Sequence, residues 1–275
     1  MPSRPEPEER PGPGAMGSRP RWERALVTGA STGIGRAVAL RLAVAGTGLV
    51  LVARDRAALD SVAAAVPVPA EVLVADLADP DDVAKVADRI TTDLDPVDLV
   101  VNNAGVGWEH DLAGADPARE ATMVAVNVGA VSVLTGAAAA ALRRRGGGGI
   151  LNVSSIAGVL PGAGSATYAA TKAYVTSLTR SANIELAPYG VTVTALCPGL
   201  TRTEFHRRAG VDNTAPRFLW QTADEVAVAG LEGLAAGKVT VVPGIPNRLG
   251  VLLAGVAPFG LVRAVVTRGR ARMRR

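Results

Sequence analysis

Short apolar runs alternate with helical patterns along the chain from residue 24 onward. The apolar runs cover residues 25–28, 48–53, 71–75, 98–102, 149–154, 190–196 and 239–242. Most are apolar throughout, which is typical of parallel strands that are covered on both faces. The stretches between them predict helices over residues 35–45, 55–65, 79–93, 116–142 and 167–187. We therefore predict an α/β fold, a single doubly wound domain with a seven-stranded parallel sheet.

Two of the predicted helices have a clear start signal. Asp79 precedes Pro80, and Asp116 precedes Pro117. Aspartate is a preferred N-cap, and proline is favoured in the first turn because its missing N–H would have no helical partner.

Composition changes at both ends of this pattern. Residues 1–20 contain six prolines and three glycines, so we expect a disordered N-terminal extension, and both Met1 and Met16 remain open as the start. Residues 21–245 form the predicted domain. Residues 246–275 form a basic, partly apolar C-terminal extension.

Positive charge is concentrated in that extension. The chain has a net charge of +4, yet residues 247–275 carry seven arginines and no acidic residue. The rest of the chain is slightly acidic, which argues against a nucleic-acid-binding body. The extension is either a solvated end or a weak contact with an anionic membrane surface or another subunit.

Cysteine and histidine are too scarce for several kinds of site. Cys197 is the single cysteine, and His110 and His206 are the two histidines, which excludes a disulfide framework and a zinc cluster. We expect no metal site. Few cysteines and no apolar leader fit a cytoplasmic protein.

Two apolar stretches are candidates for membrane insertion. Residues 121–142 carry no charge but are rich in alanine and interrupted by polar residues, so we predict a buried helix. Residues 249–262 are shorter than a membrane span of roughly 20 residues and contain Pro258, so we predict an amphipathic or docking element.

A glycine-rich turn follows the first predicted strand. Gly29, Gly33 and Gly35 occur in the sequence TGASTGIG, directly before a helix. Glycines allow the backbone to approach a pyrophosphate, and the helix N-terminus favours its charge. The turn is also compatible with a simple tight connection, but its position at the first strand favours the dinucleotide site of a Rossmann-type domain.

The end of the second strand bears on which nucleotide binds. Arg54 follows this strand and is placed to contact a 2′-phosphate, which favours NADP(H). Asp55 is either a helix cap or the acid of an NAD(H) site. Asp76, after the third strand, is either an adenine contact or a helix-entry cap. Asn103 lies in the sequence NNAG after the fourth strand, where an asparagine can tie strand ends together.

The strongest catalytic signal is the pair Tyr168 and Lys172. Residues four apart share one helix face, and an adjacent ammonium is expected to lower the pKa of the phenol. Ser154 and Ser155 end the preceding strand, at the sheet edge where ligands bind. Ser155 is expected to donate a hydrogen bond to a substrate oxygen.

These motifs together resemble the short-chain dehydrogenase/reductase family over about residues 24–245. The resemblance implies that Tyr168 is the general acid and base, that Lys172 lowers its pKa and binds the nicotinamide ribose, and that Ser155 orients the substrate. It also implies that Asn127 completes a proton relay. The expected cofactor contacts are Gly29, Ser31, Thr32, Gly33, Ile34, Gly35, Arg54, Asp76, Leu77, Asn103, Tyr168, Lys172, Pro198, Gly199, Thr201 and Thr203.

The family often has valine or isoleucine where Thr201 stands, which leaves the carboxamide contact at that position open. Members of the family commonly form dimers or tetramers through small apolar helix faces, and we expect a homodimer or homotetramer.

The resemblance implies an NADP(H)-dependent oxidoreductase that transfers hydride between the nicotinamide and a carbonyl or secondary alcohol. Residues 204–222 combine aromatic side chains with arginines, which suits a lipophilic ketone or ketoacyl compound, or else a lid whose aromatic side chains pack on their own core. Alternatives are an NAD-dependent alcohol dehydrogenase and an inactive NADP-binding sensor or scaffold. A sugar-nucleotide epimerase or dehydratase is less consistent with the motif and the chain length.

Overall fold

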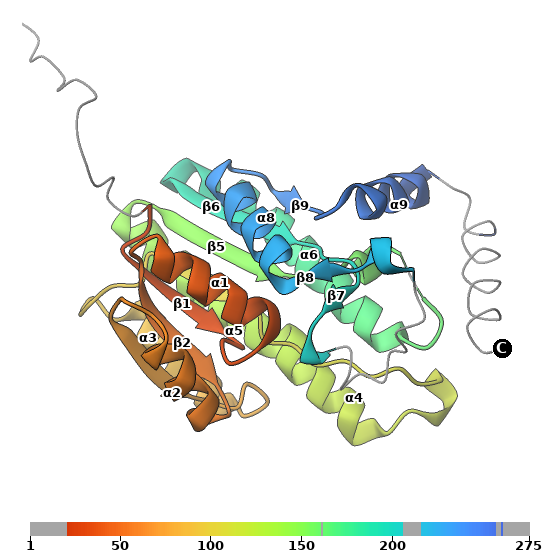
Figure 1. The fold of residues 1–275 in the computed structure, drawn as a ribbon, viewed down its shortest axis with the longest axis horizontal. Coiled ribbons are helices and arrows are strands. Elements are labelled where there is room, and N and C mark those ends of the chain that lie inside the picture. Colours follow the sequence, from red (N-terminus) through yellow and green to blue (C-terminus); the bar gives the residue numbers. More distant parts are fainter. Residues whose placement is uncertain (1–20, 161, 206–215, 257–259, 261–275) are drawn as a thin grey trace, which may run out of the picture.

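The computed structural model describes residues 21–160, 162–205, 216–256 and 260. A seven-stranded parallel sheet has the order β3-β2-β1-β4-β5-β6-β9 (Figure 1). Its strands are β1 (Arg24–Thr28), β2 (Gly48–Ala53), β3 (Ala70–Val74), β4 (Leu99–Asn102), β5 (Gly148–Val153), β6 (Val191–Leu196) and β9 (Thr240–Val241). The predicted α/β fold with seven parallel strands is confirmed. The predicted N-terminal extension and most of the C-terminal one lie outside the described residues.

Helices cover both faces of this sheet. They are α1 (Gly33–Val44), α2 (Arg56–Ala64), α3 (Pro80–Thr91), α4 (Pro117–Val124), α5 (Val131–Arg145), α6 (Ala166–Leu186), α8 (Ala223–Ala235) and α9 (Ile245–Val256). Short 3₁₀ turns occupy Leu112–Gly114, Ile156–Gly158, Ala187–Tyr189 and Arg217–Leu219. Two short strands, β7 (Thr201–Arg202) and β8 (Gln221–Thr222), form a separate parallel pair.

Strand residues divide between two cores. Val27 and Leu51 face a core formed with α1, α2 and α8, whereas Leu26 and Val50 face a core formed with α3, α5 and α6. Successive strand residues point to opposite faces, so an apolar run fills both cores at once. Figure 1 shows α1 and α8 side by side on one face of the sheet.

The predicted start signals are confirmed. The Asp79 carboxylate accepts a hydrogen bond from the backbone N–H of Asp81, and the Asp116 carboxylate accepts one from Ala118. In each case proline occupies the first turn, so sequence and structure agree on where α3 and α4 begin.

The helix predicted over residues 116–142 is present as a continuous helical stretch from Pro117 to Arg145, but it is not an α-helix throughout. A π-helical segment, Ala125–Ala130, separates α4 from α5, and α5 continues to Arg145. Such segments place an extra residue within a helix and are common at functional sites. Gly146 ends α5 with a φ of 78°, in the left-handed region that glycine tolerates.

Within the described residues, the combined helix from Pro117 to Arg145 is long and apolar enough to cross a membrane by length and composition. One face of it is instead packed into the core, where Leu134, Ala138 and Leu142 have at most 1% of their surface exposed. The predicted buried helix is therefore what the structure shows.

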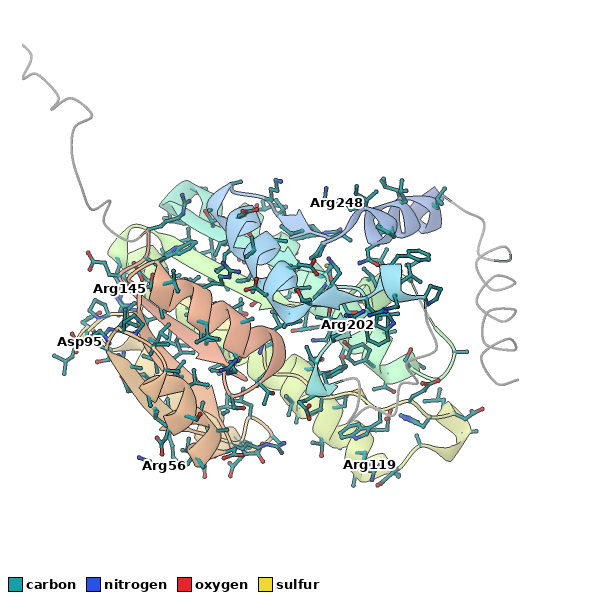
Figure 2. All side chains as sticks on the ribbon, viewed as in Figure 1. Arg56, Asp95, Arg119, Arg145, Arg202 and Arg248 are labelled. Carbon is teal, nitrogen blue, oxygen red and sulfur yellow. The ribbon has the colours of Figure 1, made fainter. Side chains whose placement is uncertain are left out.

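The amino and carboxyl ends of the parallel strands lie at opposite edges of the sheet and carry different side chains. Figure 2 shows Arg145 and Asp95 near the end of the molecule where α5 ends, far from Arg202 on β7. At that end Arg145 donates to backbone carbonyls, including those of Ile90 and Val97, and closes the connection between α3 and β4. The residues expected to carry chemistry lie at the opposite edge, where the parallel strands end.

Candidate active site

The glycine-rich turn lies between the ends of β1, β2 and β4. Gly29 has a φ of 65° and Gly33 a φ of 57°, both in the left-handed region that disfavours other residues. A methyl group at Gly35 would overlap the Asn103 amide and the Gly29 carbonyl. Glycine at this position therefore allows α1 to begin in contact with the strand ends.

Asn103 ties two strand ends together. Its side-chain amide donates to the carbonyl of Thr28 at 2.9 Å, and its backbone N–H donates to the Thr28 hydroxyl at 2.9 Å. The hydroxyl of Thr28 donates in turn to the carbonyl of Val101. This is the structural role predicted for an asparagine here.

The N-terminus of α1 is suited to an anion. Its N-cap, Thr32, makes no side-chain cap bond, and its first turn holds no acidic residue. By contrast, α2, α3, α4 and α8 all have a side-chain cap. The first-turn N–H groups of α1, close to Ser31 and Ile34, fit the pyrophosphate of a dinucleotide.

Arg54 lies next to this turn. The backbone N–H of Ala30 in the turn donates to the carbonyl of Val52, two residues before Arg54. The Arg54 side chain is 65% exposed and lies 3.8 Å from the Asp76 carboxylate. It is thus a cation at the nucleotide edge, held only by a loose ion pair.

Asp55 and Asp76 both make capping hydrogen bonds to backbone N–H groups, as one of the two alternatives for each residue predicts. Asp55 is the N-cap of α2, accepting from the backbone N–H of Ala58 at 3.0 Å. Asp76 accepts from the N–H of Ala78 at 3.0 Å and caps the turn before α3, whose own N-cap is Asp79. Leu77, which directly follows Asp76, is buried.

The two serines that end β5 have different surroundings. The Ser154 hydroxyl is buried and donates to the Lys172 carbonyl at 2.7 Å. Ser155 lies instead beside the hydroxyl of Tyr168, where it opposes the rise in the pKa of the phenol. Its oxygen also accepts from the N–H of Ala157 at 3.1 Å. Ser155 is therefore the serine that the fold brings to the phenol.

Lys172 lies on the same face of α6 as Tyr168. Its ammonium is 5.7 Å from the centroid of the Tyr168 ring and donates to the carbonyl of Val153 at 2.9 Å. The cation therefore lies over the ring and is bonded to the end of β5.

The expected lowering of the Tyr168 pKa is not found, and the pKa is raised instead. Burial raises the pKa of Tyr168 to about 12, and the neighbouring Ser155 hydroxyl opposes this only in part. Burial also lowers the pKa of Lys172 to about 8. Desolvation disfavours both charged forms, and it exceeds the effect of one neighbour on the other.

Asn127 lies in the π-helical segment and faces the same site. Its amide exchanges two hydrogen bonds with the backbone of Val106, at 2.8 and 2.9 Å, and donates to the Thr171 hydroxyl at 3.1 Å. A Cβ atom at Gly105 would lie 3.3 Å from the Asn127 amide oxygen and 3.4 Å from the Lys172 ammonium. The side chains of Asn127 and Lys172 therefore both lie close to Gly105.

The segment after β6 borders both halves of the site. The carbonyl of Pro198 accepts from the Ser155 hydroxyl at 3.5 Å, and the Thr201 hydroxyl donates to the carbonyl of Gly199 at 3.0 Å. A Cβ atom at Gly33 would lie 3.2 Å from Thr203. This segment therefore spans the distance from the serine to the glycine-rich turn.

Several residues that shape the site have no motif to identify them. A Cβ atom at Gly107 would lie 2.9 Å from the Tyr168 ring, and the Phe205 ring is 5.7 Å from it. A Cβ atom at Gly158 would lie 2.7 Å from the backbone of Lys172. A glycine in a loop after a strand gives no signal of such contacts in the sequence alone.

The expected specificity segment is only partly described. Arg207 and Arg208 lie outside the described residues, as does His206. In the described part of 204–222, Phe205 packs on Tyr168 and Phe218 is 73% exposed. Among the described residues, no group of three or more His, Cys, Asp or Glu side chains could hold a metal ion.

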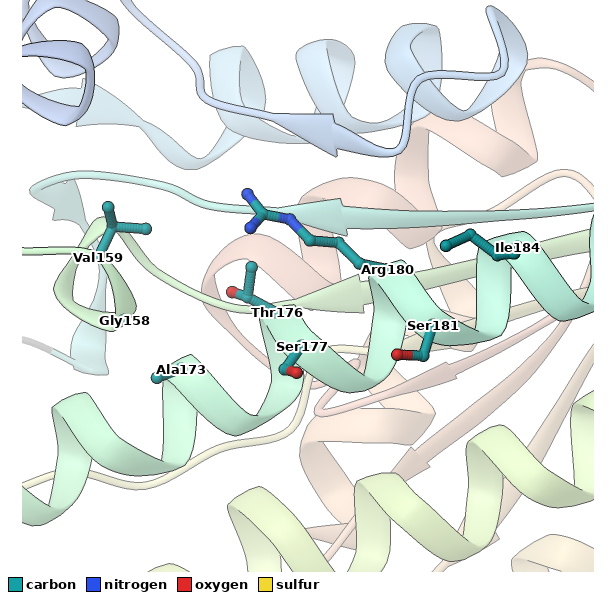
Figure 3. Close-up of a pocket in the computed structure, with 8 residues that line it drawn as sticks. All are labelled: Gly158, Val159, Ala173, Thr176, Ser177, Arg180, Ser181 and Ile184. Carbon is teal, nitrogen blue, oxygen red and sulfur yellow. The ribbon is translucent and has the colours of Figure 1, made fainter. Parts of the chain in front are cut away.

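A groove of about 460 Å³ lies on the outer side of α6, away from these catalytic candidates (Figure 3). Ala173, Ser177, Arg180 and Ile184 line it from the helix. None of the residues predicted to be catalytic lines this groove, so we do not assign it to the reaction.

Comparison with known proteins agrees with this geometry. The family model for short chain dehydrogenases matches residues 23–213. A solved short-chain dehydrogenase from Sphingobium yanoikuyae in complex with NADPH is 34% identical, with a TM-score of 0.78, covering 89% of this chain and 95% of that one.

Two further structures are similar to the chain. The bulky-bulky ketone specific alcohol dehydrogenase from Comamonas testosteroni is 32% identical, with a TM-score of 0.74 and coverage of 85% and 93% of the two chains. The 3-ketoacyl-(acyl-carrier-protein) reductase from Brucella melitensis, complexed with NADH, is 30% identical, with a TM-score of 0.73 and coverage of 80% and 94%. The chain therefore belongs to the short-chain dehydrogenase family and is an NAD(P)-dependent oxidoreductase that acts on carbonyl or alcohol groups.

Proposed function

We propose that the protein is an NADP(H)-dependent reductase of lipophilic ketones or ketoacyl compounds, working from the domain of residues 21–245. The observation that carries the proposal is the grouping of three side chains: the Lys172 ammonium lies 5.7 Å from the centroid of the Tyr168 ring, and Ser155 lies beside the Tyr168 hydroxyl. An acid, a hydrogen-bond donor and a cation are thus grouped at the carboxyl edge of the sheet, where ligands bind in such folds.

NADP(H), when bound, supplies or accepts the hydride. Tyr168 holds a proton on its phenol oxygen and donates it to the oxygen of the substrate carbonyl. Ser155 donates a hydrogen bond to the same oxygen and stabilises the negative charge that develops there. In the reverse direction Tyr168 accepts the proton of an alcohol.

Lys172 and Asn127 support the phenol in this proposal. The Lys172 ammonium provides positive charge at the Tyr168 ring and can donate to a ribose hydroxyl. Asn127 holds the loop after β4 through its two bonds to Val106 and lies beside Lys172 against Gly105. Both N–H groups of its amide are already bonded, to Val106 and Thr171, so its part in the proposed proton relay is to hold the loop beside Lys172 and not to carry the proton itself.

The preference for NADP(H) over NAD(H) rests on Arg54 and Asp55. The Arg54 guanidinium is 65% exposed beside the glycine-rich turn, available for a 2′-phosphate. The Asp55 carboxylate is engaged as a helix cap and is less suited to a ribose hydroxyl. The NADPH in the Sphingobium complex supports this preference, whereas the NADH in the Brucella complex shows that the family binds both.

A fluorescence titration with NADPH and NADH tests the cofactor preference. We expect NADPH to bind about tenfold more tightly, equivalent to about 1.4 kcal/mol. Arg54→Ala should remove this difference and leave NADH binding unchanged. Arg56→Ala is the matched control, because Arg56 is a nearby exposed arginine paired with Asp60 within α2. An unchanged Kd for NADPH in Arg54→Ala would show that the phosphate lies elsewhere.

The substrate class is supported by the surroundings of Tyr168. The Phe205 ring packs against the phenol ring, which gives the reacting group an apolar neighbour. The name of the Comamonas protein specifies bulky-bulky ketones, and that of the Brucella protein specifies 3-ketoacyl-(acyl-carrier-protein). We expect NADPH oxidation with bulky aryl ketones or acetoacetyl thioesters, and much less with small polar ketones. Tight NADPH binding without turnover of either class would favour the alternative of an inactive NADP-binding scaffold.

Association through α5 and α6 is part of the proposal, together with a cytoplasmic location. Val133, Tyr174 and Ile184 are exposed on these helices, and Ile184 is 76% exposed beside the groove of Figure 3. We expect a homodimer or homotetramer by light scattering. Ile184→Glu should reduce the measured mass, whereas a monomer mass for the unmodified protein would exclude this assembly.

A further inference from the structure

The helix α9 carries an exposed apolar face. Ile245, Leu249, Leu252 and Leu253 have 70%, 55%, 67% and 66% of their surface exposed. Their spacing of four, three and one residues places all four on one side of the helix. Exposed apolar residues that occur singly are ordinary, but four on one face form a patch that calls for a partner.

The opposite side of α9 is fixed to the body of the protein. The buried Asn247 side chain donates to the Gln221 side chain at 3.0 Å and to the carbonyl of Pro243 at 2.8 Å. Arg248, labelled in Figure 2 beside α9, donates to the carbonyl of Val242 at 2.8 Å. The helix therefore has a defined orientation, and this orientation turns its leucines outward.

The sequence from residue 247 onward carries charge of one sign. Residues 247–275 contain Arg248, Arg263, Arg268, Arg270, Arg272, Arg274 and Arg275, and no aspartate or glutamate. Only Arg248 belongs to α9, and the other six arginines follow it in the sequence, outside the described residues. Exposed leucines followed by a run of arginines are typical of a segment that binds the surface of an anionic membrane.

A second copy of this chain is a poorer partner for the same face. In a two-fold symmetric contact the same surface meets itself, so two α9 helices would bring two arginine-rich segments together. Neither segment contains an acid to compensate that charge. Anionic lipid instead offers hydrocarbon for the leucines and negative headgroups for the arginines.

We propose that the face formed by Ile245, Leu249, Leu252 and Leu253 docks the protein onto an anionic phospholipid bilayer, as a peripheral contact that is assisted by the arginines that follow. The proposal concerns a surface and is independent of the function proposed above.

Docking in this way would also position the active site. A Cβ atom at Gly199 would overlap the Asn247 side chain, so α9 packs directly on the connection that follows β6. The preceding Pro198 carbonyl accepts from Ser155. The rim of the candidate site is thus linked to α9 by adjacent contacts and would be held near the bilayer.

Vesicle co-sedimentation of the full-length protein tests the proposal. We expect binding to vesicles of mixed phosphatidylglycerol and phosphatidylcholine at low salt, with little binding to phosphatidylcholine alone and a marked loss at high salt. Leu252→Glu with Leu253→Glu should weaken binding about tenfold or more, because a charged group replaces each inserted apolar one. Leu252→Ser with Leu253→Ser is a milder second variant that should also weaken binding.

A matched control carries the same charge change at another place. Val44 and Leu94 are each 81% exposed and belong to α1 and to the connection after α3. The double variant Val44→Glu with Leu94→Glu should bind vesicles like the unmodified protein. Circular dichroism and NADPH binding report whether each variant is folded.

Three results would overturn the proposal. The first is no difference between anionic and neutral vesicles. The second is unchanged vesicle binding in both α9 variants, which would place the contact on another surface. The third is a protein that ignores vesicles but dissociates to a smaller mass when the α9 leucines are changed, which would make a second copy the partner.

Discussion

Ser154 and Ser155 are consecutive residues at the end of β5, yet they contact opposite ends of one turn of α6. Ser154 donates to the carbonyl of Lys172, and Ser155 lies beside the hydroxyl of Tyr168, which is four residues before Lys172 in the chain. Successive residues of an extended chain point in opposite directions, so one serine can fasten the helix while the other faces the site. Substitution of Ser154 should therefore affect mainly stability, and substitution of Ser155 should affect mainly catalysis.

Ser155→Ala should lower kcat by about 10²-fold or more, because it removes a donor to the developing oxyanion, and should leave the Kd for NADPH unchanged. Ser154→Ala should retain most of the activity and lower the free energy of unfolding by about 1 kcal/mol, since a buried hydrogen bond is lost. Steady-state kinetics and thermal unfolding of both variants check this. Equal loss of kcat in the two variants would contradict the assignment.

The raised pKa of Tyr168 predicts different pH profiles for the two directions of the reaction. Carbonyl reduction requires the protonated phenol, which is present far below a pKa of about 12. Alcohol oxidation requires the phenolate, whose population rises about tenfold per pH unit below the pKa. We expect kcat/KM for oxidation to increase steadily up to pH 10, because this parameter reports the free enzyme.

A plateau of the oxidation profile below pH 8 would show that the phenol ionises more readily than its burial implies. Spectroscopic titration of phenolate gives an independent value, with Tyr168→Phe identifying the contribution of this residue against those of Tyr174 and Tyr189.

Lys172→Met should abolish activity and stabilise the fold. Burial lowers the pKa of Lys172 to about 8, below the value of 10.5 expected in the unfolded chain. The unfolded chain therefore binds more protons between these values, so stability rises with pH across this window and the penalty for the buried ammonium is complete below it. After loss of the bond to Val153 is considered, we expect a gain of about 1–2 kcal/mol and a Tm higher by about 2–8 °C.

Thermal unfolding at pH 7 checks this prediction, with Lys238→Met as the control because Lys238 is exposed. A lower Tm for Lys172→Met than for the unmodified protein would mean that the ammonium stabilises the fold.

Gly158→Ala should impair catalysis by moving Ser155. A Cβ atom at Gly158 would lie 2.7 Å from the backbone of Lys172 and Ala173, so the 3₁₀ turn that follows Ser155 must shift away from α6. A displacement of about 1 Å can lower the rate about 10²-fold, so we expect a large decrease in kcat with unchanged NADPH affinity. Gly114→Ala is the control, because no atom lies within 4 Å of a Cβ atom there. Full activity of Gly158→Ala would show that the turn yields without moving the serine.

The sheet could be predicted because its strands are buried on both faces. A run such as residues 49–52 is apolar throughout, and each of its side chains has a core to fill. The caps at Asp79 and Asp116 could be predicted for a local reason, since capping depends on residues only two or three positions apart.

The relationships between distant segments could not be derived in this way. The spacing of Tyr168 and Lys172 places both on one face of α6. The direction in which the pKa of Tyr168 shifts depends instead on burial, to which distant residues such as Gly107 and Phe205 contribute by packing against its ring. The choice between the two serines likewise depends on which one reaches α6. Those are properties of packing, to which no sequence motif corresponds.

The π-helical segment around Asn127 has a consequence for how this helix tolerates change. The turn is wider than an α-helical one and takes in one extra residue. The alanine-rich face of α5 meets the sheet, while Asn127 keeps its direction toward Val106 and Thr171. Because the wide turn absorbs the extra residue, deletion of one residue between 125 and 130 would let the helix become regular and leave the packed face of α5 against the sheet. The change would fall on the turn that carries Asn127, so this stretch would tolerate a shorter chain in its packing but not in the direction of its one buried amide.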